Sequence, residues 1–143
     1  MPRWLSEGIS VYEEQIANPS WGDRMSPEYR EMILGDDLTK VSKLSSAFLK
    51  AKTGKHLQFA YFESSLVVQF IVEKFGEESL VGVLDALAIG IPINDALARH
   101  VGPIDLLDKK FETYVTSAAQ EYGKNFDWEK SEQPLTSSAS WQG

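Results

Sequence analysis

The stretch that decides the fold runs from Leu57 to Phe75, LQFAYFESSLVVQFIVEKF, and it is the most apolar segment of the 143-residue chain. Its large apolar residues recur at helical spacing on two sides: Phe59, Phe62, Leu66 and Phe70 on one, Tyr61, Val68, Ile71 and Phe75 on another. A helix that is apolar on more than one side is covered on more than one side. The pattern therefore predicts a central buried helix, with Gly76 as its C-terminal cap.

The remaining chain also shows helical signals, and no segment has a convincing strand pattern. Ser26 followed by Pro27 predicts a short helix that ends near Leu34. Further helices are expected over residues 4–17, 78–88, 92–101 and 103–118, with a segment of uncertain length through Val41, Leu44 and Phe48. We therefore expect an all-α fold, a compact bundle of about six helices.

The chain has room for one domain of ordinary globular composition. Residues 1–120 are expected to form it, and residues 121–143 to be a tail or linker, because that stretch contains Pro134, several serines and no sustained period.

The helix expected from Trp4 to Ala17 is apolar on two sides. One side carries Leu5, Ile9, Tyr12 and Ile16, and the other carries Trp4 and Val11 with Glu7 between them. Such a helix should lie between other elements rather than on a surface. Asn18-Pro19 is expected to end it.

Charge and composition exclude several function classes. The net charge of −7 disfavours a nucleic-acid partner, because phosphates would be repelled. The chain has no cysteine, so disulfides, thiolate metal sites and cysteine nucleophiles are excluded. No apolar run approaches the roughly 18 residues needed for a membrane span, and the first residues do not resemble a signal peptide. Localisation stays open.

The chemistry is concentrated in one stretch, PRWLSEGISVYEE, from Pro2 to Glu14. A glutamate in the first turns of a helix, such as Glu7, has a simple explanation in the helix dipole. Its place between Trp4 and Val11 favours another, since a covered carboxylate needs a cation or several hydrogen-bond donors. The residues alone leave both explanations open.

The pattern Trp4-Leu5-x-Glu7-Gly8-x-x-x-Tyr12 resembles the third-ligand motif of gluzincin zinc metallopeptidases, especially membrane alanyl aminopeptidases and bacterial peptidase-MA-like proteins. In those families a His-Glu-x-x-His helix supplies two zinc ligands and a general base. The resemblance implies that Glu7 is the third zinc ligand of an intact enzyme that acts on peptides or proteins. The fold it implies is the C-terminal helical subdomain of such a peptidase.

The resemblance continues over about residues 2–118. The run from Phe59 to Leu66 resembles the "AYxxS" helix of peptidase-MA-like proteins, and the helices after Gly76 follow in the same order. In some gluzincins a tyrosine donates a hydrogen bond to the reacting oxyanion, which makes Tyr61 a possible catalytic residue. Tyr61 could equally be a core aromatic whose hydroxyl has a backbone partner.

The chain departs from the family pattern in its histidines. His56 and His100 are the only two, and neither belongs to a His-Glu-x-x-His. A lone glutamate does not hold zinc, so the isolated chain is expected to bind no zinc and to have no peptidase activity. An upstream segment of the same protein would have to supply the missing ligands.

Two functions of different classes remain. The chain is either the C-terminal part of a zinc-dependent metallopeptidase or a non-catalytic helical scaffold that binds other proteins. If the chain stands alone, its first helix is expected to expose Trp4, Val11 and Glu7 together. An uncovered apolar face of that kind predicts self-association.

Overall fold

The computed structural model describes residues 1–17, 25–35 and 37–136, with side chains up to Gly123. Within these residues the chain forms seven α-helices and one 3₁₀ turn, without a strand, which confirms the all-α prediction. The elements are α1 (Arg3–Ala17), α2 (Pro27–Leu34), η1 (Val41–Lys43), α3 (Leu44–Lys50), α4 (Gly54–Phe75), α5 (Glu77–Ala88), α6 (Ile93–His100) and α7 (Ile104–Thr136). The expected stop at Asn18-Pro19 lies outside the described residues.

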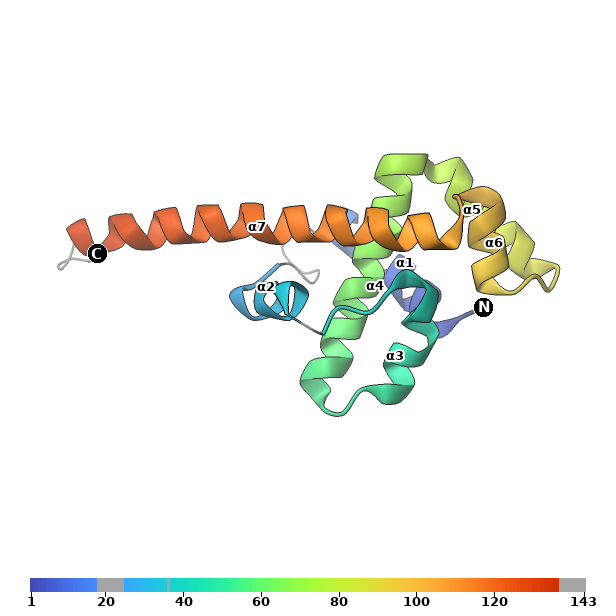
Figure 1. Cartoon of the computed structure of the whole chain (residues 1–143), viewed down its shortest axis with the longest axis horizontal. Helices are drawn as coiled ribbons and strands as arrows, with labels where there is room; N and C mark the ends of the chain where they lie inside the picture. Colours follow the sequence, from blue (N-terminus) through green and yellow to red (C-terminus); the bar gives the residue numbers. More distant parts are fainter. Residues whose placement is uncertain (18–24, 36, 137–143) are drawn as a thin grey trace.

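Helix α4 is the central helix that its composition predicts (Figure 1). It begins one turn earlier than expected, because the Thr53 side chain caps it by accepting a hydrogen bond from the backbone N–H of His56. It ends at Gly76, which has φ +90° and ψ 156° and whose N–H donates to the Val72 carbonyl. Gly76 is also the only residue between α4 and α5, so one pair of torsions sets the angle between two helices.

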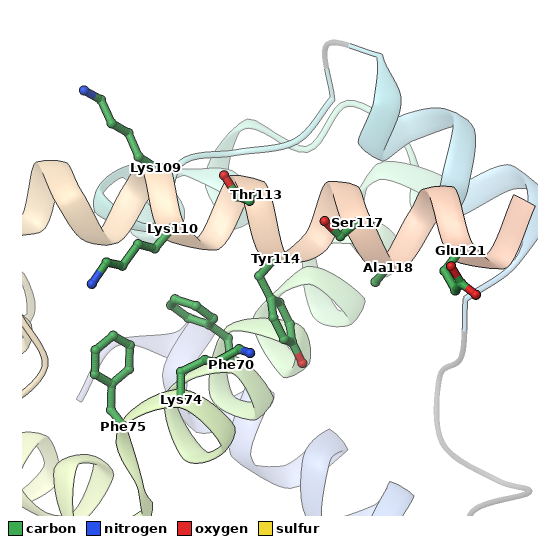
Figure 2. A pocket seen from close by; sticks show the side chains of 10 residues that line it. All are labelled: Phe70, Lys74, Phe75, Lys109, Lys110, Thr113, Tyr114, Ser117, Ala118 and Glu121. Carbon is green, nitrogen blue, oxygen red and sulfur yellow. The ribbon is translucent and has the colours of Figure 1, made fainter.

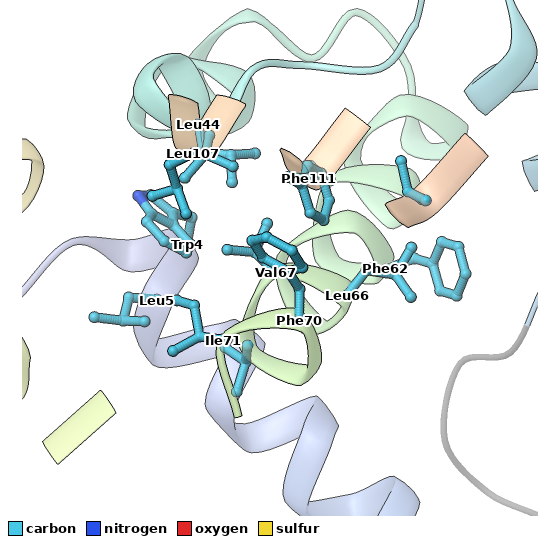
Figure 3. Packing of buried hydrophobic residues seen from close by; sticks show 14 of the residues in the cluster. Trp4, Leu5, Leu44, Phe62, Leu66, Val67, Phe70, Ile71, Leu107 and Phe111 are labelled. Carbon is cyan, nitrogen blue, oxygen red and sulfur yellow. The ribbon is translucent and has the colours of Figure 1, made fainter. Parts of the chain in front are cut away.

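Helix α1 packs chiefly against α4 and buries Trp4, Leu5 and Gly8. The Trp4 side chain is only 1% exposed, so the expectation of an exposed Trp4 on the first helix is wrong. Figure 3 shows Trp4 directed toward Leu44 and Leu107, which belong to the same buried cluster. The chain itself covers Trp4, whereas Glu7 and Val11 of the same face are half-buried. Self-association through this face stays a prediction.

Of the short elements before α4, α2 begins where the sequence predicts. At the start of α2, the Ser26 hydroxyl accepts a hydrogen bond from the N–H of Tyr29 at 3.1 Å, and Pro27 occupies the first turn. The segment through Val41, Leu44 and Phe48 divides into η1 and α3, and all three of these residues are buried.

Helix α7 crosses α4 and closes the core (Figure 1). The rings of Phe70 and Phe111 meet edge to face with 5.6 Å between their centroids, and Val115 and Ala119 extend the buried stripe of α7. The α7 backbone continues to Thr136, past the point where residues 121–143 are expected to begin a tail. That domain boundary stays a prediction.

None of the described helices combines the length and apolar character that crossing a membrane requires.

Candidate functional site

The helix that carries the third-ligand pattern is held by a close crossing with α4 at Gly8. A Cβ atom added to Gly8 would lie 2.6 Å from the carbonyl oxygen of Ser64 and 2.8 Å from its carbonyl carbon. No side chain fits there, so glycine is required for the two backbones to approach this closely. The small residues of the two motifs, Gly8 and Ser64, are therefore partners at one crossing point.

The hydroxyl of Ser64 serves the same crossing. It is fully buried and donates to the carbonyl of Ala60 at 2.7 Å, within its own helix. The neighbouring Ser65 donates to the Phe62 carbonyl at 2.7 Å in the same way. Both hydroxyls are satisfied locally, which lets short polar side chains line a tight helix contact without an unpaired group.

Glu7 lies next to this crossing in the sequence, directly before the buried Gly8. Its own side chain is half-buried. No hydrogen bond or ion pair joins its carboxylate to another residue of the described part of the chain. The covered environment expected between Trp4 and Val11 is thus present in part. The carboxylate is held in place by its helix, and no residue of the described part binds its oxygens.

Tyr61 lies at the N-terminal end of the same helix pair. Its hydroxyl accepts a hydrogen bond from Nη2 of Arg3 at 2.7 Å. The Arg3 guanidinium also lies 5.1 Å from the ring centroid of Phe48 and 5.8 Å from that of Tyr61. Because Arg3 and Glu7 are four residues apart on α1, they share one face of that helix.

These contacts bear on the two interpretations of the Tyr61 hydroxyl, and its catalytic role stays a prediction. Its partner is a side chain near the surface, and a backbone group inside the core is not involved. An accepting phenol keeps its own hydrogen free to donate. The Tyr61 hydroxyl can therefore donate to a further acceptor while it accepts from Arg3.

With this geometry in view, the comparisons with known proteins identify the family. A family model described as the peptidase MA superfamily matches residues 1–117, more than half of the chain. The chain belongs to the peptidase MA superfamily. Searches of curated proteins and of solved structures found no match.

Peptidase MA proteins are typically associated with zinc. Within the described residues, no three side chains of His, Cys, Asp or Glu gather in a way that could hold a metal. His56 forms a hydrogen bond to the Thr53 hydroxyl at 2.8 Å and lies 3.6 Å from Asp37. These residues of the chain do not by themselves fit a zinc ion.

His100 has a packing role in this peptidase MA chain. It lies in the last turn of α6, where a histidine is favoured by the helix dipole. A Cβ on Gly82 of α5 would come 2.5 Å from Nδ1 of His100, so the glycine makes room for the imidazole ring.

Sequence reasoning missed Glu63, the most deeply buried acidic residue of the described part. It is 1% exposed; its Oε1 accepts from the backbone N–H of Thr39 at 3.0 Å, and its Oε2 has no partner. Burial raises the pKa of this carboxyl to about 8, while the Thr39 hydrogen bond works in the opposite direction. The side chain is therefore mainly neutral at pH 7. A glutamate between Phe62 and Ser64 inside the most apolar segment was the available signal.

The last residue of the third-ligand pattern, Tyr12, faces the acidic end of α4. Burial raises its pKa, and the charges of Glu73 and Glu77 add to the effect. Nearby, the Tyr114 hydroxyl donates to Glu73 at 3.0 Å and accepts from Gln69 at 2.9 Å. These hydrogen bonds join α7 to α4, the helix against which α1 packs.

Proposed function

We propose that this chain is the C-terminal helical part of a zinc-dependent metallopeptidase of the gluzincin type, and that Glu7 is the third zinc ligand of the intact enzyme. A segment bearing His-Glu-x-x-His would supply the other two ligands and the general base. On this proposal the isolated chain is not catalytic, because one carboxylate does not hold zinc.

The observation that carries the proposal is the state of the Glu7 carboxylate. It follows a helix start anchored by the buried Trp4 and Leu5, and it precedes the tightly packed Gly8. A position fixed so firmly, with oxygens that no described residue satisfies, suits a group that binds something outside the chain. The match of the family model to the same region supports a peptidase-like function.

Tyr61 is proposed as a hydrogen-bond donor to the oxygen that becomes negative when a peptide carbonyl is attacked. Such donors act in the transition state, where the negative charge develops. The free hydrogen of the Tyr61 hydroxyl and the position of Arg3 behind it support this role. Tyr61→Phe in an active enzyme should lower kcat with little change in KM.

The experiment compares Glu7→Gln with Glu14→Gln in the protein that includes the upstream segment. Glu14 is an exposed residue of the same helix, so its variant makes the same chemical change away from the site. Glu7→Gln should lose most of the bound zinc, measured by metal analysis after dialysis, together with peptide hydrolysis. Glu14→Gln should keep both.

Full zinc content and activity in Glu7→Gln would reject Glu7 as a ligand. An intact protein that binds no zinc even with Glu7 present would favour the alternative function, a non-catalytic helical scaffold with a peptidase-like fold.

A further inference from the structure

A groove of about 920 Å³ lies between the C-terminal half of α4 and helix α7 (Figure 2). Two partly exposed aromatic rings, those of Phe75 and Tyr114, form its floor, and Phe70, only 2% exposed, lies beneath them. Phe70 meets Phe75 edge to face at 5.6 Å and lies 5.2 Å from Tyr114, so one buried ring supports both rings of the floor. Neither Glu7 nor Tyr61 lines this groove, which separates it from the proposed peptidase site.

Two lysines stand on opposite walls of the groove. Lys74 of α4 places its Nζ 5.8 Å from the ring centroid of Tyr114, and Lys110 of α7 places its Nζ 5.8 Å from that of Phe75. Figure 2 shows both side chains on the groove side of their helices, and Lys109 of α7 also belongs to the groove lining. A cation over an aromatic face is held in position without losing its charge.

Neither of these ammonium groups has a carboxylate partner in the described part of the chain. The ion pairs found there join Lys55 to Glu28 and His56 to Asp37. Yet the chain as a whole carries 21 acidic residues against 14 basic ones. Two unpaired cations over an apolar floor, on a molecule of net negative charge, form a local surface that complements an apolar and acidic partner.

The apolar surface continues past the groove along α7. A smaller hollow shares Phe75 and Lys110 with it and adds Val101 and Leu106, and the Leu106 side chain is 47% exposed. From Leu106 to Ala118 the helix rises by about 18 Å at roughly 1.5 Å per residue. This length accommodates about five or six residues of an extended peptide.

We propose that this groove binds a peptide segment of a partner protein in which large apolar side chains are flanked by carboxylates. The apolar side chains lie against Phe75 and Tyr114, and the carboxylates face Lys74 and Lys110. A ligand with a single acidic head, such as a fatty acid, does not match two ammonium groups on separate walls. Glu121 lies at the far end of the groove, so the acidic part of the peptide lies toward Phe75.

The test measures binding of fluorescein-labelled peptides to the full chain by fluorescence anisotropy. The probe is a peptide of about six residues that alternates leucine or phenylalanine with glutamate, a length chosen to span the groove. One control peptide has lysine in place of glutamate, and a second has serine in place of the apolar residues. The probe should bind, and both control peptides should bind at least about tenfold more weakly.

The protein variant that tests the walls is Lys74→Glu combined with Lys110→Glu. Its matched control is Lys50→Glu with Lys52→Glu, which makes the same change in net charge at exposed positions in and after α3. The groove variant should weaken probe binding by at least about tenfold, and the control variant by less than about twofold. Circular dichroism checks that both remain folded.

Three results would overturn the proposal. The first is no saturable binding of the probe below about 1 mM, a limit corresponding to roughly 4 kcal/mol of binding free energy. The second is equal loss of binding in the two double variants, which would mean that the attraction is not local. The third is a wild-type chain that dimerises in sedimentation while the groove variant stays monomeric, which would assign the groove to a second copy of this chain.

Discussion

Glu7 and Glu63 occupy matching places on the two helices that cross most closely, because each immediately precedes the small residue at the crossing, Gly8 or Ser64. Their environments are opposite. Glu63 is enclosed, accepts one backbone hydrogen bond and has its pKa raised by burial to about 8. Glu7 is half-buried, and no described residue binds its oxygens.

The comparison shows that deep burial and availability for binding are distinct properties of a carboxylate. Burial keeps the Glu63 carboxyl protonated at neutral pH. Glu63 therefore fills space in the core and accepts one hydrogen bond from Thr39. A carboxylate that binds an external ligand must be accessible to solvent and have oxygens without internal partners. Glu7 is half-buried, and no described residue binds its oxygens. The following changes test that contrast, beginning with the one expected to affect stability most.

The crossing itself is broken most severely by Gly8→Ala. The new Cβ would meet the Ser64 carbonyl oxygen at 2.6 Å, which forces the two helix backbones apart. Although alanine favours helix by about 1 kcal/mol, the clash should lower the free energy of unfolding by about 2–3 kcal/mol in urea titration. Gly54→Ala, where no atom lies within 4 Å, is the control and should lose nothing. Equal stability of the two variants would contradict the close packing.

Glu63→Gln should raise stability at alkaline pH. The folded-state pKa of Glu63, about 8, lies above its ordinary value of 4.5, so the folded protein holds a proton that the unfolded chain has lost. The contribution of Glu63 to stability is therefore complete below pH 4.5 and falls as the pH rises through 8. The amide has no such loss, so at pH 9 the variant should be more stable by roughly 2 kcal/mol.

At pH 4 the two proteins should differ little, because Glu63 is protonated in both folded and unfolded states. Thermal or urea unfolding across this pH range measures the difference. The exposed Glu28 supplies the control variant, Glu28→Gln, which should keep the slope of the parent protein. A slope between pH 5 and 8 that survives Glu63→Gln would show that the carboxyl is not the source.

The contact between Arg3 and Tyr61, two residues of the proposed site region, is tested next. Their hydrogen bond and the stacking of the guanidinium over the ring should couple them by about 0.5 kcal/mol, small because Arg3 is exposed. A double-mutant cycle with Arg3→Met and Tyr61→Phe measures this coupling free energy directly. Strict additivity of the two single changes would mean that the contact does not hold Tyr61 in place.

Glu7→Gln should have the smallest effect on the isolated chain, within about 0.5 kcal/mol of the parent in urea unfolding. The reason is that no described residue depends on its charge. A loss above about 1 kcal/mol would reveal a structural partner for the carboxylate and remove the contrast with Glu63. Together with the zinc measurement in the intact protein, a neutral result separates a binding role from a folding role.

Local patterns predicted most of the helices because their causes are local. Ser26 and Pro27 define the start of α2, by capping and by a fixed backbone torsion. The apolar run of α4 must be buried whichever elements surround it. Gly76 as a helix end is likewise a property of one residue.

What the sequence did not reveal depends on segments that meet only in the fold. Glu63 finds its donor at Thr39, 24 positions away, and Tyr61 finds Arg3 at a separation of 58. Trp4 belongs to a buried cluster that includes residues as distant as Leu107. Periodicity says that a side chain is apolar or polar, but not which distant element will cover it.

The single residue Gly76 between α4 and α5 also fixes the length of the chain at that joint. Inserting one residue there would turn α5 by about 100° around its own axis, since a helix has 3.6 residues per turn. Val83 and Ala86 would then leave the core and solvent-facing positions would replace them. Evolution can exchange residues along both helices, but a length change at this joint would need a compensating change in the connection to α6.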